Sequence, residues 1–159
     1  MKKLFLCLSL VFMPIFAMAA SYVAGDQISP ISLLDQNDKP LNVTDDTKVV
    51  LFSRSMKGGE IIKETLAPLT PEQFPKNLVY IADISDMPSL IAKFVAIPKM
   101  KEFSFAIGLD REGDISRLLP DTKDMATMIV LKQLSIQDIA YFDSSEALAQ
   151  ALAKLPQSE

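Results

Sequence analysis

The sequence predicts an α/β fold in which strands of a central mixed sheet alternate with helices. The runs 48–53 (KVVLFS) and 78–84 (LVYIADI) are short, apolar and rich in β-branched residues, which is typical of strands buried on both faces of a sheet. Apolar residues recur at helical spacing after each run, over 60–69 and 86–96. Strand and helix therefore alternate along the chain, as in a layered α/β domain.

Two glycines separate the first predicted strand from the first predicted helix. We expect Gly58 and Gly59 to break the chain after 48–53, with a helix following over 60–69. Its buried positions are expected to be Ile61, Ile62, Leu66 and Leu69. Thr70-Pro71-Glu72-Gln73 predicts a further short helix, because a capping threonine precedes a proline at the first helical position.

The second predicted helix begins around Asp86 and Pro88 and continues to about Ala96. Four large apolar residues recur within it at helical spacing. We expect these residues to form its buried face: Leu90, Ile91, Phe94 and Val95.

The C-terminal part predicts three more strands and one more helix. The strands are expected at 103–109, 127–131 and 136–142, and the polar segment 110–114 is expected to be a turn. The last two strands should pair antiparallel, because only 132–135 connects them.

The final helix is expected to begin at Asp143, since Asp143 and Glu146 have the spacing of a capping box. Its inward stripe is predicted to consist of Leu148, Leu152 and Leu155.

Residues 1–19 have the organisation of a cleaved export signal. Lys2 and Lys3 precede the apolar stretch 4–16, and Ala17-Met18-Ala19 supplies the small-x-small pattern that signal peptidase cleaves. Residues 20–159 are then expected to form a single domain. No later segment approaches the roughly 20 apolar residues of a spanning helix. The sequence thus predicts a periplasmic or secreted bacterial protein without stable membrane insertion.

Charge and cysteine content exclude several classes of function. The chain has 16 basic and 20 acidic residues, and removal of Lys2 and Lys3 leaves 14 against 20, a net charge of −6. This sign disfavours nucleic acid as a partner. The only cysteine is Cys7, inside the predicted signal, so no disulfide is expected after cleavage.

An ordered set of short motifs carries a family resemblance. The motifs are Gly25-Asp26, Pro30, Leu33-Leu34-Asp35, Asp38-Lys39-Pro40-Leu41 and Lys48-Val49-Val50-Leu51. Together they resemble the opening of peroxiredoxins and of TlpA/ResA-type proteins of the thioredoxin-like superfamily. The stretch 126–131 (ATMIVL) and the following strand are similar to the peroxiredoxin Ala-Thr hairpin. The resemblance implies a three-layer α/β/α sandwich with a central mixed sheet and an N-terminal β-hairpin.

The sequence departs from this family at the redox site. Relatives carry a thiolate in the loop after the Lys-Val-Val-Leu strand, at a helix N-terminus. The equivalent segment here, 53–60 (SRSMKGGE), has no cysteine. Met125 stands where peroxiredoxins have an arginine, and Ala126 stands where thioredoxins have a proline before Thr127. The resemblance therefore implies a redox-inactive relative, as in the YtfJ-type periplasmic proteins, with no cofactor.

The same loop is the main candidate binding site: Arg54, Ser55, Met56, Lys57, Gly58 and Gly59. Basic side chains and free backbone N–H groups before a helix can hold an anion. The alternative is that the glycines close a tight turn and the basic side chains are solvated. A serine nucleophile is disfavoured, because the chain has no histidine to act as its base.

Secondary candidates lie at the ends of other strands. Asp83 and Asp86 follow the strand 78–84, where ligands of α/β proteins tend to bind, although Asp86 can instead cap a helix. Ala126 and Thr127 are candidates through the resemblance. The acidic residues of 110–114 do not match the calcium-loop pattern, so a solvated turn is expected and no metal site is predicted.

Two hypotheses follow from the sequence. The first is a non-catalytic module that binds another exported protein or peptide through the loop with Met56 and Lys57 at its tip. The alternative is a small-molecule anion binder or enzyme that uses the Arg54–Gly59 loop.

Overall fold

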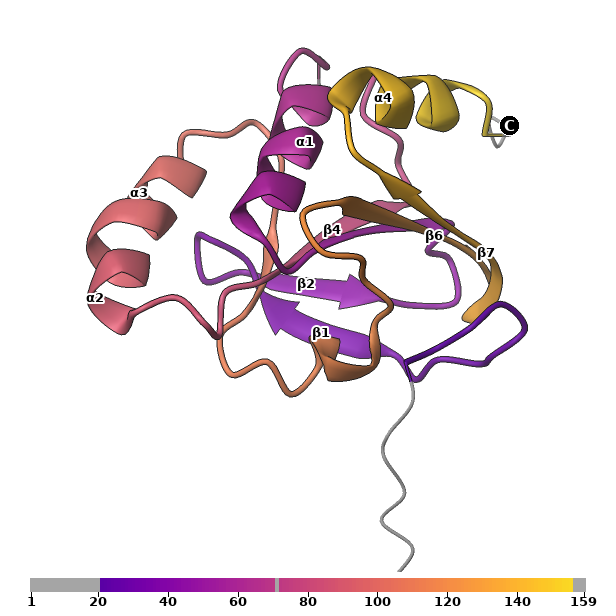
Figure 1. Cartoon of the computed structure of the whole chain (residues 1–159), viewed down its shortest axis with the longest axis horizontal. Coiled ribbons are helices and arrows are strands. Elements are labelled where there is room, and N and C mark those ends of the chain that lie inside the picture. The colour runs from indigo at the N-terminus through magenta and orange to yellow at the C-terminus, as the bar shows by residue number, and fades with distance from the viewer. Residues whose placement is uncertain (1–20, 71, 156–159) are drawn as a thin grey trace, which may run out of the picture.

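The structure is a computed structural model that describes residues 21–70 and 72–155; the predicted signal lies outside the described residues. It contains seven strands, namely β1 (Ile31–Leu34), β2 (Pro40–Val43), β3 (Val49–Ser53), β4 (Leu78–Asp83), β5 (Gly108–Asp110), β6 (Ala126–Lys132) and β7 (Ser135–Phe142). The helices are α1 (Met56–Leu66), α2 (Ser89–Ile91), the π-helix η1 (Ala92–Ala96), α3 (Ile97–Met100), the 3-10 turn η2 (Ser116–Leu118) and α4 (Ser145–Ala153) (Figure 1).

All seven strands form one mixed sheet in the order β2-β1-β5-β4-β3-β6-β7. The central strands β3, β4 and β5 are parallel, whereas β6 pairs antiparallel with both β3 and β7. The hairpin β1–β2 joins the sheet antiparallel to β5. This arrangement confirms the predicted mixed α/β fold and its N-terminal hairpin.

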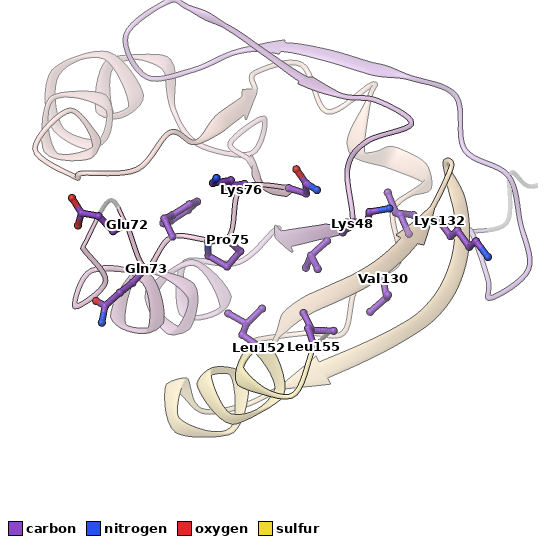
Figure 2. A pocket seen from close by; sticks show the side chains of 13 residues that line it. Lys48, Glu72, Gln73, Pro75, Lys76, Val130, Lys132, Leu152 and Leu155 are labelled. Atoms are coloured by element: carbon purple, nitrogen blue, oxygen red, sulfur yellow. The ribbon is translucent and has the colours of Figure 1, made fainter. Parts of the chain in front are cut away.

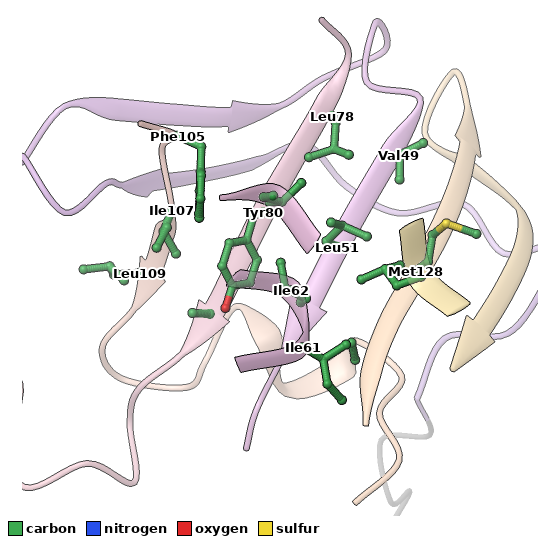
Figure 3. Packing of buried hydrophobic residues seen from close by; sticks show 14 of the residues in the cluster. Val49, Leu51, Ile61, Ile62, Leu78, Tyr80, Phe105, Ile107, Leu109 and Met128 are labelled. Carbon is green, nitrogen blue, oxygen red and sulfur yellow. The ribbon is translucent and has the colours of Figure 1, made fainter. Parts of the chain in front are cut away.

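Alternating residues of the central strands fill two cores on opposite faces of the sheet. Val49 and Leu51 pack on one face, beneath α1 and α4, together with Tyr80 of β4 (Figure 3). Val50 and Phe52 pack on the other face. There the segment before β1, through Tyr22 and Ile28, and Leu119 after η2 cover the sheet. Among the described residues, η2 is the helical turn on this second face.

The segment before β1 covers part of the edge at β7. Gly25 donates a hydrogen bond to the Ile136 carbonyl at 2.8 Å, and the Ile136 N–H donates to Asp26 at 2.8 Å. Ile28 likewise donates to the Leu134 carbonyl at 2.9 Å. The beginning of β7 is therefore not open for pairing with another chain.

The prediction that Gly58 and Gly59 break the chain is wrong, because both lie in the first turn of α1. A Cβ atom added to Gly58 would lie 2.3 Å from the Met125 carbonyl oxygen. Glycine at this position thus allows the first turn of α1 to pack directly against the backbone that leads into β6. The helix also ends earlier than predicted, at Leu66.

The short helix predicted at 70–73 is also not observed. Residues 72–74 form a turn in which the N–H groups of Gln73 and Phe74 donate to the Thr70 carbonyl, at 2.9 and 3.1 Å. Pro71 lies outside the described residues.

The apolar face of the second predicted helix faces solvent rather than the core. Helical structure runs from Ser89 to Met100, but four side chains within it are 48% to 69% exposed: Leu90, Ile91, Phe94 and Val95. Ala92, Ile97 and Met100 make the contacts with the core instead. The π-helical turn at 92–96 has a wider period than an α-helix, so the spacing rule assigned the wrong face.

The predicted strand 103–109 is reduced to β5, because a side chain replaces a neighbouring strand over 105–107. The Gln36 amide donates to the Phe105 carbonyl at 2.8 Å and accepts from the Ile107 N–H at 2.8 Å. Gln36 is buried, so these bonds satisfy backbone groups that would otherwise lack partners.

The final helix is close to its prediction except at its beginning. Its N-cap is Ser144 and no side chain caps it, so Asp143 and Glu146 do not form the expected capping box. Leu148 is fully buried, and Leu152 and Leu155 are partly buried against the same core. Within the described ranges, no helix combines the length and hydropathy needed to cross a bilayer.

Candidate functional site

The turn from β3 into α1 is closed by its own side chain. Ser55 is the N-cap of α1, with an extended backbone, and its Oγ accepts a hydrogen bond from the Gly58 N–H at 3.0 Å. This is the standard way in which serine satisfies a free N–H at a helix start. Met56 and Lys57 follow at the first two helical positions. Both are exposed, and the Met56 side chain is 87% exposed.

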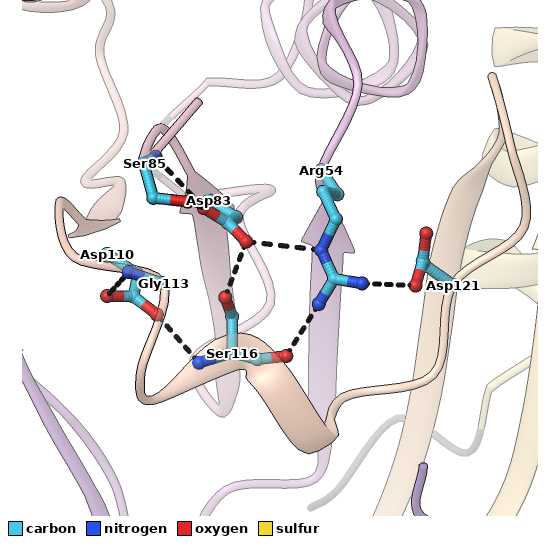
Figure 4. Close-up of polar contacts among 7 residues, drawn as sticks. All are labelled: Arg54, Asp83, Ser85, Asp110, Gly113, Ser116 and Asp121. Atoms are coloured by element: carbon cyan, nitrogen blue, oxygen red, sulfur yellow. Dashed lines mark hydrogen bonds and ion pairs between the residues drawn. The ribbon is translucent and has the colours of Figure 1, made fainter. Parts of the chain in front are cut away.

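Arg54 lies on the face of the sheet opposite to α1. There three groups of the chain accept hydrogen bonds from its guanidinium (Figure 4). Its Nε donates to the Asp83 carboxylate at 3.1 Å, and its Nη1 donates to Asp121 at 2.5 Å. Its Nη2 donates to the Ser116 carbonyl at 2.8 Å. The guanidinium also stacks over the Phe52 ring, 5.3 Å from its centroid.

Asp83 is the centre of this polar cluster. Its Oδ2 accepts from Arg54 and from the Ser116 hydroxyl at 2.8 Å, while its Oδ1 accepts from the Ser85 hydroxyl at 2.7 Å and the Ser85 N–H at 3.0 Å. Burial of Asp83 acts to raise its pKa, but the hydrogen bonds from Ser85, Ser116 and Arg54 outweigh burial and lower the pKa overall. Asp83 is therefore a stabilised carboxylate rather than a proton donor.

The predicted turn at 110–114 belongs to the same cluster. Asp110 is buried, and its carboxylate accepts from the N–H groups of Gly113 at 2.9 Å and Ser116 at 2.7 Å. Gly113 has a φ of 77° and lies against Ser85, so glycine is required at this position. Glu112 and Asp114 lie in the same turn, and neither forms an ion pair among the described residues.

The structure does not bring the secondary candidates of the sequence into one site with Asp83. Asp86 is exposed and does not contact Asp83, and it does not cap α2, whose N-cap is Pro88. Ala126 is buried directly after Met125, the residue whose carbonyl lies against Gly58. Thr127 is also fully buried, and its hydroxyl has no hydrogen-bond partner among the residues described.

The chemistry available at this site is limited. The Ser53 hydroxyl is paired with the Tyr80 hydroxyl at 2.9 Å, and burial of Tyr80 raises its pKa to about 12, so neither group is activated near neutral pH. An anion bound at the start of α1 would compete with Asp83 and Asp121 for Arg54. The sequence did not single out Ser116 or Asp121, because the residues that contact Arg54 lie up to 67 positions away.

Comparisons with known proteins agree with the architecture. No protein-family model matches the chain, and no curated protein matches it by sequence. Solved structures match over most of its length. Peroxidoxin BcpB from Mycobacterium tuberculosis superposes with a TM-score of 0.55 at 14% identity, covering 85% of this chain and 98% of its own.

Two further structures share the arrangement. The thioredoxin domain of a thiol-disulfide oxidoreductase from Bacteroides vulgatus gives a TM-score of 0.55 at 17% identity, over 84% of this chain and 98% of its own. An exposed lipoprotein thioredoxin from Streptococcus pneumoniae gives 0.52 at 14% identity, over 80% and 100%. With Cys7 as its only cysteine, this chain cannot form the two-cysteine pair of a disulfide oxidoreductase. The structural matches show that the chain has a thioredoxin-like fold, similar to that of peroxiredoxins and thiol-disulfide oxidoreductases.

Proposed function

We propose that this protein is an exported, non-catalytic thioredoxin-like module that binds another exported protein or peptide in the bacterial periplasm. The contact surface consists of the tip of the β3–α1 turn, Met56 and Lys57, and the exposed apolar face of the neighbouring helix, which is Leu90, Ile91, Phe94 and Val95. We call the second part the 90–95 face.

The observation that carries this proposal is the exposure of large apolar side chains at one side of the fold. Met56 is 87% exposed, and Leu90 and Phe94 are 69% and 66% exposed. Clusters of such residues on a folded surface mark sites of protein interaction more often than scattered ones do. The 90–95 face also includes a π-helical turn, a feature frequent at functional sites.

Met56 and the 90–95 face belong to helices that cover the same core. Ile61 and Ile62 of α1 and Ile97 and Met100 of the segment 89–100 pack on this core, and Figure 1 shows both helical segments. We propose that one partner contacts both.

The charges beside this surface indicate the chemistry of the partner. Between Ser89 and Lys101 the only charged residues are Lys93, Lys99 and Lys101, and Lys57 adds a fourth positive charge beside Met56. The chain as a whole is acidic. The surface therefore fits a protein segment that presents apolar side chains beside acidic ones.

Site-specific photo-crosslinking in the native host tests the proposal. A photoreactive phenylalanine analogue is placed at position 56 or at position 94, with position 141 as control, because Tyr141 is a part-exposed aromatic on β7. We expect one protein to be crosslinked from both 56 and 94 and not from 141. The captured protein should then bind the purified mature chain directly.

The direct binding assay decides the outcome. Leu90→Ser with Phe94→Ser should abolish binding while the far-ultraviolet circular dichroism and melting temperature stay unchanged. A captured protein that binds this folded variant as well as it binds the wild type would refute the proposed surface. The export part of the proposal is tested separately. The mass of the protein recovered from the periplasm should be that of a chain beginning at Ala20, if cleavage follows Ala19.

A further inference from the structure

A second surface, distant from the proposed interaction surface, has the properties of a small-molecule site. A cavity of about 550 Å³ lies where β3 begins and β6 ends, beside the C-terminal end of α4 (Figure 2). Since β3 runs from Val49 at the cavity to Ser53 at the candidate loop, the two sites lie at opposite ends of that strand. The volume is within the range of about 300–1,000 Å³ of known ligand pockets.

The floor of the cavity is apolar and only partly covered. Val49 and Val130 contribute from the sheet, Phe74 from the turn before β4, and Leu152 and Leu155 from the end of α4. All except Val49 are partly buried rather than fully buried. An apolar chain bound here would remove this surface from water, which is favourable in proportion to the area covered.

Three lysines line the rim of the same cavity: Lys48 and Lys132 at one end, and Lys76 beside Pro75 (Figure 2). Backbone hydrogen bonds fix the segments that carry them next to one another, since the Lys48 N–H donates to Asn77 at 2.8 Å and its carbonyl accepts from Leu131 at 2.8 Å. None of the three forms an ion pair with any residue that the structure describes. An anion bound at the rim would complement these positive charges.

Glu72 is the one acidic residue of the lining, and it lies at the far end of the cavity from Lys48 and Lys132 (Figure 2). The cavity is thus polarised, with two lysines at one end, an apolar middle formed by Val130, Leu155 and Leu152, and a carboxylate at the other end. This distribution orients a ligand that has an anionic head and an apolar tail.

We infer that this cavity binds an amphiphilic carboxylate, a molecule with one carboxylate head and an aliphatic chain. The head lies between Lys48 and Lys132. The chain lies over Val130, Leu155 and Leu152. The site is independent of the protein-binding surface proposed above, because it shares no residue with it.

Binding of dodecanoate to the mature protein tests the inference, with calorimetry for affinity and amide NMR shifts for location. We expect dodecanoate to shift the amides of Val49, Val130 and Leu131. Dodecanol, which lacks the charge, and acetate, which lacks the chain, should each bind at least about tenfold more weakly, because each lacks one of the two contributions.

The variant with Lys48→Gln, Lys76→Gln and Lys132→Gln should weaken dodecanoate binding about tenfold, since it removes the charge at the rim. A matched variant with Lys93→Gln, Lys99→Gln and Lys101→Gln has the same change in net charge and should bind as the wild type does. All six lysines lie on the surface, and Leu155→Asn provides a second test that reduces only the apolar floor.

Three outcomes would overturn the inference. They are the absence of dodecanoate binding, equal losses in the two lysine variants, and amide shifts that map to 90–95 rather than to the cavity. The last result would mean that the amphiphile binds to the exposed apolar face.

Discussion

In the polar cluster around Arg54 the chain itself supplies hydrogen-bond partners for the charged groups, whereas on the 90–95 face it leaves large apolar side chains exposed to solvent. In the cluster, Arg54, Asp83 and Asp110 each have two or more hydrogen-bond partners within the chain. On the 90–95 face, the large apolar side chains contact little and are 48% to 69% exposed. The first region is complete without a ligand, whereas the second leaves apolar surface in water.

We therefore expect the polar cluster to contribute to the stability of the fold and the 90–95 face to contribute to binding. The cluster occupies the carboxyl ends of parallel strands, the usual ligand position of an α/β sheet, yet its charged groups are used to hold β4, the 110–114 turn and η2 together. Changes there should reduce the stability of the fold, while changes on the 90–95 face should reduce binding and leave stability unchanged.

The largest effect is expected where α1 meets β6 beside the cluster. Gly58→Ala would place a methyl group 2.3 Å from the Met125 carbonyl oxygen, so the helix or the strand must move. We expect the free energy of unfolding to fall by about 2 to 3 kcal/mol, measured by urea denaturation. Gly59→Ala is the matched control, because its methyl group would lie 3.4 Å from the nearest atom. It should be neutral or stabilising by up to about 1 kcal/mol.

The next largest effect is expected from loss of the Asp83 charge. Asp83→Asn removes the ion pair with Arg54 and weakens the bonds from Ser85 and Ser116, which should cost about 2 kcal/mol of unfolding free energy near neutral pH. Asp46→Asn, at an exposed position without an ion pair among the described residues, should leave stability unchanged.

The pH dependence of the difference in unfolding free energy between the wild type and Asp83→Asn is a separate prediction. Folding lowers the pKa of Asp83 from its ordinary value of 3.8, so its charge stabilises the fold fully above that value. The stabilisation is lost as the pH falls through the lower pKa of the folded state. The gap in unfolding free energy between wild type and Asp83→Asn should therefore shrink below pH 3.8. A gap that stayed constant down to the acid transition would show that the ionised carboxylate is not its source.

On the 90–95 face we expect almost no change in stability. Leu90→Ser with Phe94→Ser should alter the unfolding free energy by no more than about 0.5 kcal/mol, because both side chains are already largely in water. The quantity to compare is the change in unfolding free energy of this double variant against that of Gly58→Ala. A loss of more than about 2 kcal/mol would show that these side chains pack in solution, and the two regions would then not differ as described.

The last prediction concerns the lysines beside the 90–95 face and an association rate instead of stability. The variant with Lys93→Gln, Lys99→Gln and Lys101→Gln should lower the association rate of the captured partner by about tenfold or less, and this loss should shrink as salt is added. The rim variant with Lys48→Gln, Lys76→Gln and Lys132→Gln should leave that rate unchanged. Equal effects of both variants would indicate attraction by overall charge instead of by this face.

Most of the sheet could be predicted from the sequence. The strands β3, β4 and β6 are apolar runs rich in β-branched residues, and β7 follows β6 after a short connection; each of the four lies within one or two residues of its predicted range. The hairpin β1–β2 followed from the family resemblance. These elements depend on signals that neighbouring residues supply.

The errors share a tertiary cause. Gly58 lies inside a helix because the distant Met125 carbonyl needs the space, and 105–107 is not a strand because Gln36 takes the place of one. The buried face of 89–100 was misassigned because a π-helical turn changes the period on which the prediction relied. The sequence indicated Arg54 and Asp83 as separate candidates, but their direct ion pair and their shared contacts with Ser116 appear only once the strands are assembled.

The attachment of the first described residues to the edge of β7 has a consequence for the timing of folding. Gln27 and Gln133, which are joined by a side-chain hydrogen bond, lie 106 positions apart, and Gly25 and Asp26 bond to Ile136 nearby. The sheet cannot close until almost the whole chain has been synthesised, and long-range closures of this kind form slowly. An emerging chain therefore cannot complete its sheet until β7 has been synthesised.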